Sequence, residues 1–227
     1  MKITLSTALL FSLAPGAFAK LLGQDVSHFQ GNIDWNGQKE AGSHFAYIKA
    51  TESTTYIDEK FGANYKGALD AGIVRGAYHF ARPHKSSGKE QAEYFLAHGG
   101  KWSNDGKTLP GALDLEFNPD GETCYGLSPK QMSDWVKDFS DTYYAETKRY
   151  PVIYTTASWW NQCTGSNADF GKNNPLWLAR YADSPGKNPA GWETYSIWQF
   201  ADKGKLAGDN NWWNGDEAGL AKFAKGE

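Results

Sequence analysis

The chain has 227 residues, a formal net charge of −3, two cysteines, 10 Trp and 12 Tyr. This slightly acidic balance argues against nucleic acid or an anionic membrane as a partner, because both usually select a basic face. The many Trp and Tyr side chains have an apolar ring and a polar end, which suits a groove that binds sugars. Burial in the core is nevertheless the commoner role of any single Trp.

Residues 1–19 have the features of a secretory signal peptide. They combine a basic start at Lys2, an apolar run, and the small-x-small sequence Ala-Phe-Ala that ends at Ala19. We expect cleavage after Ala19, secretion to the extracellular space, and one domain over residues 20–227. No later segment approaches the ~20 apolar residues of a membrane-spanning helix, so we expect no membrane partner.

The rest of the chain alternates short apolar, β-rich runs with helical patterns. An apolar stripe predicts a helix over residues 58–71, stopped by Gly72. Capping boxes that begin at Ser87 and at Ser128 open two further helices. The predicted strands are residues 23–27, 45–50, 72–80, 111–117, 151–155, 176–181 and 195–200.

This alternation of strand and helix indicates the α/β fold class, in which helices cover a parallel sheet. Near-continuous apolar strands fit burial on both faces, and about seven of them favour a compact, closed barrel over an open nucleotide-binding sheet. The chain contains no G-x-G-x-x-G sequence that would favour the open sheet.

The stretch PGALDLEF, residues 110–117, places two carboxylates in an apolar run. In a strand, Asp114 and Glu116 would project from the same face about 7 Å apart. An unpaired buried carboxylate is costly, but one acid kept protonated beside one kept ionised suits the hydrolysis of a glycosidic bond. On this stretch alone, a solvated or salt-bridged pair at a strand end fits equally well.

Polar and aromatic residues recur near the carboxyl ends of the predicted strands. In β/α barrels these ends meet at one mouth, where the chemistry takes place. Each residue alone has a structural explanation, such as a salt bridge for Lys49 or a hydrogen-bonded core position for His79, but their convergence indicates a site. The set is Asp25, Lys49, Glu52, His79, Arg82, Asp114, Glu116, Tyr154, Arg180, Tyr181, Gln199 and Asp209.

Cys124 and Cys163 are the two cysteines of the chain. In an oxidising compartment, an even count predicts one disulfide bond. Metal binding is the weaker interpretation, because neither the cysteines nor the five histidines have the spacing of metal ligands. We therefore expect no metal and no cofactor.

Eight segments stand in this order along the chain: GQDVSHFQGNIDW, FAYIKATE, GAYHFARP, GALDLE, PVIYT, PLWLARY, YSIWQF and DNNWWNG. Together they resemble the family 25 glycoside hydrolases, the Chalaropsis-type lysozymes, over nearly all of residues 20–227. The resemblance implies a modified, incomplete β/α barrel. It also implies cleavage of the β-1,4 bond between N-acetylmuramic acid and N-acetylglucosamine in bacterial peptidoglycan, and we expect a monomer.

The resemblance also assigns roles to single residues. The D-x-E of the family falls on Asp114 and Glu116, so Glu116 resembles the general acid and Asp114 the charged neighbour that raises its pKa and orients the substrate. Asp25 and Asp209 match two further acidic positions of the same groove. The candidate sugar contacts are Tyr78, Tyr154, Trp177, Tyr181, Gln199 and Trp212.

The resemblance further implies retention of the anomeric configuration, although the pattern supplies no clear nucleophile. A substrate-assisted route, in which the N-acetyl carbonyl attacks the anomeric carbon, resolves this and gives Asp114 the acetamido N–H to hold. Inversion would instead require water attack aided by Asp25 or Asp209. The chain has Ser53 where many relatives have glycine, which concerns a turn rather than the chemistry.

Two alternatives stay open. A chitin-cleaving glycosidase would show the longer motif D-x-x-D-x-D-x-E, but Ala112 stands four residues before Glu116. A carbohydrate-binding module on an inactive hydrolase scaffold would keep the aromatic residues and the barrel but would usually lose the acid, and Glu116 is present.

Overall fold

The computed structural model describes residues 20–227, so the predicted signal peptide and its cleavage site lie outside the described residues. The strands are β1 (Leu21–Val26), β2 (Phe45–Glu52), β3 (Tyr56–Ile57), β4 (Val74–Phe80), β5 (Ala112–Asp114), β6 (Val152–Thr155), β7 (Leu176–Ala179), β8 (Ile197–Ala201) and β9 (Asp209–Trp213). The helices are α1 (Trp35–Glu40), α2 (Phe61–Asp70), α3 (Gly88–Ala97), α4 (Pro129–Thr147), α5 (Ala157–Thr164) and α6 (Glu217–Lys225), with short 3-10 helices η1 (His28–Gln30) and η2 (Phe170–Lys172).

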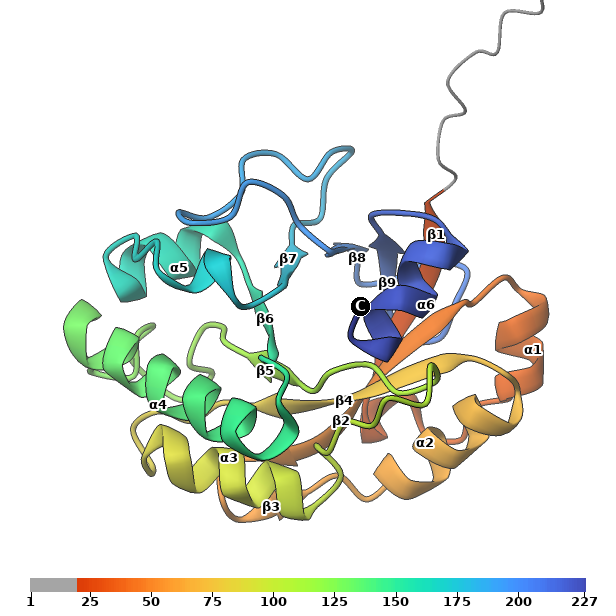
Figure 1. The fold of residues 1–227 in the computed structure, drawn as a ribbon, viewed down its shortest axis with the longest axis horizontal. Helices are drawn as coiled ribbons and strands as arrows, with labels where there is room; N and C mark the ends of the chain where they lie inside the picture. Colours follow the sequence, from red (N-terminus) through yellow and green to blue (C-terminus); the bar gives the residue numbers. More distant parts are fainter. Residues whose placement is uncertain (1–19) are drawn as a thin grey trace, which may run out of the picture.

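The sheet closes into a barrel with helices packed around it (Figure 1). The strand order is β1-β9-β8-β7-β6-β5-β4-β2-β3, and an additional β1–β2 pairing closes the ring, with β3 as a short arm on β2. Neighbouring strands from β2 to β8 are parallel, as are β1 and β2, whereas β9 runs antiparallel to both β8 and β1.

This architecture confirms the predicted α/β class and the modified, incomplete barrel. All seven predicted strands form, and residues 180–196, which join β7 to β8, contain no helix. The sequence analysis did not predict β3, β9, α1, α5 or α6.

The predicted capping boxes begin α3 and α4. The Ser87 hydroxyl accepts from the Glu90 N–H at 3.2 Å, and the Glu90 carboxylate accepts from the Ser87 N–H at 2.9 Å. Ser128 and Gln131 make the same reciprocal pair. Helix α2 begins at Phe61 rather than at residue 58, because the carboxylate of Asp58 accepts from the backbone N–H groups of His28 and Lys60.

Successive side chains of the barrel strands point alternately outward and inward, which gives two separate apolar layers. Leu113 of β5 and Ile153 of β6 face outward and pack in one cluster with Phe139 of α4. Tyr47 and Trp177 face the inside of the barrel, where their rings stack with centroids 4.8 Å apart. This inner aromatic layer lies beneath the pocket at the mouth of the barrel, and Trp177 belongs to both.

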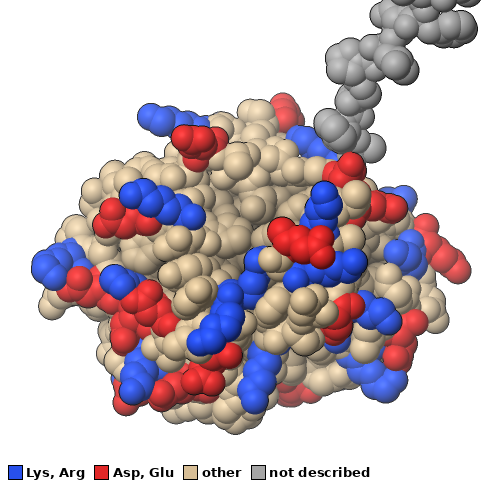
Figure 2. Space-filling view, viewed as in Figure 1, with Lys and Arg blue, Asp and Glu red and all other residues tan. Residues whose placement is uncertain are grey.

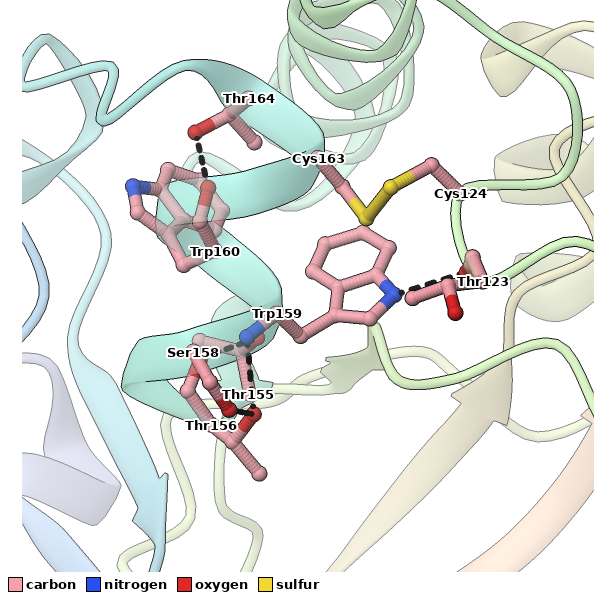
Figure 3. The surroundings of a disulfide bond; sticks show 9 residues. All are labelled: Thr123, Cys124, Thr155, Thr156, Ser158, Trp159, Trp160, Cys163 and Thr164. Carbon is pink, nitrogen blue, oxygen red and sulfur yellow. Dashed lines mark hydrogen bonds between the residues drawn. A yellow bond between two sulfur atoms is a disulfide. The ribbon is translucent and has the colours of Figure 1, made fainter.

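The predicted disulfide joins Cys124, in the loop that follows β5, to Cys163 on α5 (Figure 3). Its Cα atoms are 5.2 Å apart and its sulfur bridge spans 39 residues of sequence. Beside it, Trp159 Nε1 donates to the backbone oxygen of Thr123 at 3.2 Å. The loop after β5 is thus attached to α5 both covalently and by a hydrogen bond.

Candidate active site

A pocket of ≈ 280 Å³ opens where the carboxyl ends of the parallel strands meet. Its position matches the expectation that strand ends converge on one mouth. All the predicted catalytic and sugar-contact residues except Trp212 line it. These residues are Asp25, Tyr78, Asp114, Glu116, Tyr154, Trp177, Tyr181, Gln199 and Asp209.

Asp114 and Glu116 form an acidic pair in this pocket. Asp114 is the last residue of β5, and Glu116 lies beyond the end of the strand, so the predicted strand over residues 111–117 was too long. Asp114 is 8% exposed, and its Oδ1 atom has no hydrogen-bond partner within residues 20–227. An unsatisfied buried carboxylate oxygen is costly in the ionised form and favours the protonated acid.

Burial shifts the titration of both acids. Burial and then the negative charge of Glu116 raise the pKa of Asp114 well above its ordinary value. Burial raises the pKa of Glu116 to about 6, against the opposing positive charge of Lys49. Because burial raises both pKa values and the charge of Glu116 makes ionisation of Asp114 more costly still, the pair retains a proton in mildly acidic solution.

The amide of Gln199, on β8, connects the second acidic pair. Its Nε2 donates to Oδ2 of Asp25 at 2.9 Å and to Oδ2 of Asp209 at 3.1 Å. Its Oε1 accepts from the hydroxyls of Tyr154 at 2.8 Å and Tyr181 at 3.1 Å. An amide does not titrate, so Gln199 keeps its two donors and its acceptor at every working pH.

A second amide also holds Asp25 in place. Asn211 Nδ2 donates to Asp25 Oδ2 at 2.7 Å, and Trp177 Nε1 donates to Asn211 Oδ1 at 2.7 Å. Burial, followed by the charge of Asp209, raises the pKa of Asp25 to about 8. Asp25 therefore carries a proton at neutral pH, and the proton belongs on Oδ1 because Oδ2 already accepts two amide hydrogens.

A chain of ion pairs ties the loop after Glu116 to β2. Glu52 Oε2 lies 2.6 Å from Lys49 Nζ, and Glu52 Oε1 lies 2.6 Å from Arg82 Nη2. Arg82 Nη1 in turn lies 2.9 Å from Oδ2 of Asp120. The Arg82 guanidinium thus connects β2 to the segment that follows Glu116. Its ion pair with Glu52 is partly buried, whereas its ion pair with Asp120 is more exposed to water.

Some predicted residues lie outside the pocket. Trp212 faces the other side of β9 from Asp209, where it stacks on Phe200 with centroids 5.1 Å apart. Two residues three apart on a strand point to opposite faces, so they could not both reach the pocket. His79 is a core residue, 2.8 Å from the Thr51 hydroxyl and 2.9 Å from the Gln91 amide oxygen. His79 is therefore a hydrogen-bonded core residue, as its structural explanation had it, and not part of the site.

Other site residues were missed by the sequence analysis. Phe29, on η1, is 81% exposed and stands at the edge of the pocket, and Phe80 lines it from the end of β4. Asn211 orients Asp25, as described above. The segment VSHFQ gave no indication of Phe29, because the exposure of its ring is a property of the folded turn.

Within residues 20–227, no three His, Cys, Asp or Glu side chains are grouped as metal ligands would be. The same residues include no helix that is both long and apolar enough to cross a membrane.

Comparisons with known proteins agree with this geometry. The family model "Glycosyl hydrolases family 25" matches residues 24–209. Lysozyme M1 of Streptomyces globisporus is 50% identical over 218 residues, covering 94% of this chain and 74% of that protein. The N,O-diacetylmuramidase of Chalaropsis sp is 48% identical over 208 residues, covering 90% of this chain and 99% of that protein.

A solved structure shares the fold closely. The muramidase from Acremonium alcalophilum superposes with a TM-score of 0.90 at 51% identity, covering 91% of this chain and 100% of that one. The family model and these relatives place the chain among the glycoside hydrolases. The chain belongs to family 25 of these enzymes and is similar throughout to its Chalaropsis-type lysozymes.

Proposed function

We propose that this protein is a secreted lysozyme that hydrolyses the β-1,4 bond between N-acetylmuramic acid and N-acetylglucosamine in bacterial peptidoglycan. The observation that carries the proposal is the buried Asp114–Glu116 pair, which holds a proton at the mouth of a family 25 barrel. Three of the relatives with about half of their residues identical bear the names lysozyme, diacetylmuramidase and muramidase.

Glu116 is the general acid of the proposed reaction. Its pKa of about 6 lets it hold a proton in mildly acidic solution and release it to the glycosidic oxygen as the bond to the anomeric carbon breaks. The proton moves from the Glu116 carboxyl to the leaving sugar, which departs with a new hydroxyl. Glu116 is then a carboxylate and can take a proton from the water that completes hydrolysis.

Asp114 orients the reacting sugar. The exposed part of its carboxyl group, at the wall of the pocket, accepts the acetamido N–H of N-acetylmuramic acid. A hydrogen bond to the ionised form lowers the pKa of a carboxyl, so substrate binding moves the shared proton from Asp114 to Glu116, where it is needed. The acetamido oxygen then attacks the anomeric carbon, and the oxazolinium ion so formed is stabilised by the adjacent Asp114 carboxylate.

Asp25 and Asp209 bind or steady the sugar in this scheme rather than attack it. A protonated Asp25 is a poor base at neutral pH, which favours substrate assistance over direct water attack from that side of the pocket. The stereochemistry of the product tests this choice, because inversion would give one of these two acids the role of general base.

Recognition of the wall rests on the groove rather than on overall charge. The chain carries a net charge of −3, and acidic and basic side chains intermingle over the face seen in Figure 2. A long-range field that attracts a polyanion requires charge of one sign over a wide area. Secretion is supported by the disulfide, which is typical of oxidising compartments.

Purified bacterial peptidoglycan, incubated with residues 20–227 of the protein, tests the function. The soluble fragments are reduced with borohydride and identified by mass spectrometry. We expect ends in reduced N-acetylmuramic acid, with the rate of release falling at least ~100-fold in Glu116→Gln, because general acid catalysis contributes that much or more. The exposed Glu122, in the same loop, provides the matched control Glu122→Gln.

Ends in reduced N-acetylglucosamine would make the protein a glucosaminidase. Binding without release by the unaltered protein would favour the alternative of a sugar-binding module.

A further inference from the structure

Helix α4 packs on the outside of the barrel (Figure 1), and a second pocket, of ≈ 350 Å³, lies beside it. The lining of this α4 pocket comes from residues 133–141 of α4, from Tyr150, and from residues 167–174 in and around η2. Tyr150 precedes β6 and residues 167–174 precede β7, so the α4 pocket extends toward the amino ends of these strands. Among residues 20–227, none lines both this pocket and the catalytic pocket, which opens at the carboxyl ends. The two pockets can therefore hold ligands at the same time.

Buried amide and hydroxyl groups line the α4 pocket. Asn174 is 3% exposed and Ser140 is 2% exposed. Asn174 Nδ2 donates to Ser140 Oγ at 2.8 Å and to the backbone oxygen of Pro151 at 2.9 Å, which uses both hydrogens of that nitrogen. The amide is thereby held in one orientation, and its oxygen keeps the capacity to accept a hydrogen bond. Asn173, which is exposed, adds a second amide to the lining.

An aromatic ring with a fixed orientation also lines the α4 pocket. The ring of Tyr150 stacks on that of Tyr144, with centroids 4.2 Å apart and an angle of 19° between the planes. Tyr144 is not part of the lining, so the surface that Tyr150 presents to the pocket is not the face that Tyr144 covers. A ring held in this way loses little conformational freedom when a sugar stacks on it.

The charges of the α4 pocket disfavour an anion. Its lining contains the acids Asp134, Asp141 and Asp169 and the base Lys137. The Asp134 carboxylate lies 2.6 Å from Lys130 Nζ, and Asp141 pairs with Lys137. Even with Lys130 included, the acids outnumber the bases, so a ligand that carries a carboxylate or phosphate would be repelled. The hydroxyl and N–H groups of an uncharged ligand can instead donate to these carboxylates.

These features together match an uncharged sugar that carries an acetamido group. An aromatic ring suits the apolar face of a sugar, and amide and carboxylate oxygens suit its hydroxyl and acetamido N–H groups. Of the two sugars of bacterial peptidoglycan, N-acetylmuramic acid carries a lactyl carboxylate or an acidic peptide, whereas N-acetylglucosamine is neutral. The charge of the α4 pocket therefore favours N-acetylglucosamine.

We infer that the α4 pocket is a second glycan-binding site, in which an N-acetylglucosamine residue of a β-1,4-linked chain stacks on Tyr150 and hydrogen-bonds to the amides of Asn173 and Asn174. The site holds the enzyme on an insoluble glycan while another part of the glycan occupies the catalytic pocket, and two contacts with one polymer raise the overall affinity. Bacterial peptidoglycan as the polymer rests on the proposed function, but the α4 pocket and its sugar do not.

The test begins with binding of the Glu116→Gln protein, which does not cleave its ligand, to insoluble peptidoglycan and to insoluble chitin, measured by sedimentation. Chitin is a β-1,4 chain of N-acetylglucosamine without muramic acid or peptide. We expect Tyr150→Ala, added to this protein, to weaken binding to both polymers about tenfold, and Asn173→Ala to weaken it about threefold. Tyr94, a half-buried aromatic on α3 that stacks on His98 with centroids 4.2 Å apart, gives the matched control Tyr94→Ala, which should change neither affinity.

Cleavage by the protein with Glu116 intact separates the α4 pocket from the catalytic pocket. Tyr150→Ala should lower the rate on insoluble peptidoglycan about tenfold at low peptidoglycan concentration, because the second contact with the polymer is lost. It should leave kcat/KM for a soluble, peptide-free tetrasaccharide of the same glycan within about twofold, because so short a ligand gains nothing from the second contact.

Three outcomes would overturn the inference. Unchanged binding of Tyr150→Ala and Asn173→Ala to both polymers would mean that the α4 pocket holds no sugar. Weaker binding to peptidoglycan alone would mean that its ligand is muramic acid or the attached peptide. Equal losses of cleavage on the tetrasaccharide and on peptidoglycan would show that Tyr150 supports the catalytic pocket or the fold. If the unaltered protein releases muramic acid ends while any of these results holds, the inference fails and the proposed function stands. No release, with binding to both polymers weakened by Tyr150→Ala, would refute the proposed function and support the second site.

Discussion

Removing the Cys124–Cys163 bridge should cost the protein much of its stability. The bridge closes a separation of 39 residues, and at that length the loss of unfolded-chain entropy corresponds to about 4 kcal/mol at 25 °C. Alanine is the substitution of choice, because a serine hydroxyl at the fully buried position 163 would add the cost of an unpaired polar group. For a chain of this size, the same change lowers the melting temperature by about 8–16 °C.

The assay is urea unfolding of the unaltered and the Cys124→Ala/Cys163→Ala proteins, followed by tryptophan fluorescence. Trp159 is buried against the bridge and reports on its surroundings (Figure 3). Reduction of the unaltered protein is the control, since it should reproduce the loss without any change of side-chain volume. A loss below about 1 kcal/mol in both would refute the reasoning, because the entropy model allows no such value for this loop.

Three further predictions concern the acid and its surroundings. Dye release from labelled peptidoglycan should fall about tenfold for each pH unit above about 6, because Glu116 acts in its protonated form. Asp209→Asn should move this fall in rate to lower pH, because the variant removes a charge that raises the pKa of Glu116. A shift to higher pH would contradict the assignment of Glu116 as the acid. Ser53 adopts φ +52, so Ser53→Gly should raise the free energy of unfolding by about 0.5–1 kcal/mol in urea, whereas Ser53→Ala should not. Arg82→Lys should lower kcat about tenfold with little change in KM, since it loosens the loop that carries the acid. Asp120→Asn weakens the contact by which Arg82 reaches that loop and should lower kcat in the same direction but less, because this ion pair is exposed. An unchanged kcat in Arg82→Lys would show that Arg82 does not position the loop.

The barrel strands were predictable because their residues are apolar and β-branched or aromatic in short runs. β9 was not, since its sequence DNNWW begins with Asp and Asn, which are depleted in strands. Its pairing with β8 and β1 supplies what local preference does not. Helix α5 was missed for a similar reason, because ASWWNQCT contains few strong helix formers and is held by burial of its two Trp residues.

The acids of the site could be predicted from their positions at strand ends and from the family resemblance. The side chains that arrange them could not. Asn211 contacts Asp25 only because β9 lies beside β1, and Trp212 was assigned to the groove because the strand that turns it away had not been predicted. The exposure of Phe29 likewise follows from the tight 3-10 turn after β1 rather than from any pattern of its own residues.

The closure of the barrel by β9 joins parts of the site that lie far apart in the chain. Asp25 and Asn211, which hydrogen-bond across the β1–β9 seam, are 186 residues apart in the chain. Contacts so distant in sequence form late, because the entropy of closing the intervening chain must be lost before they stabilise anything. Until β9 has paired with β1, Asp25 therefore lacks Asn211 and Asp209 beside it, and the sugar site is incomplete.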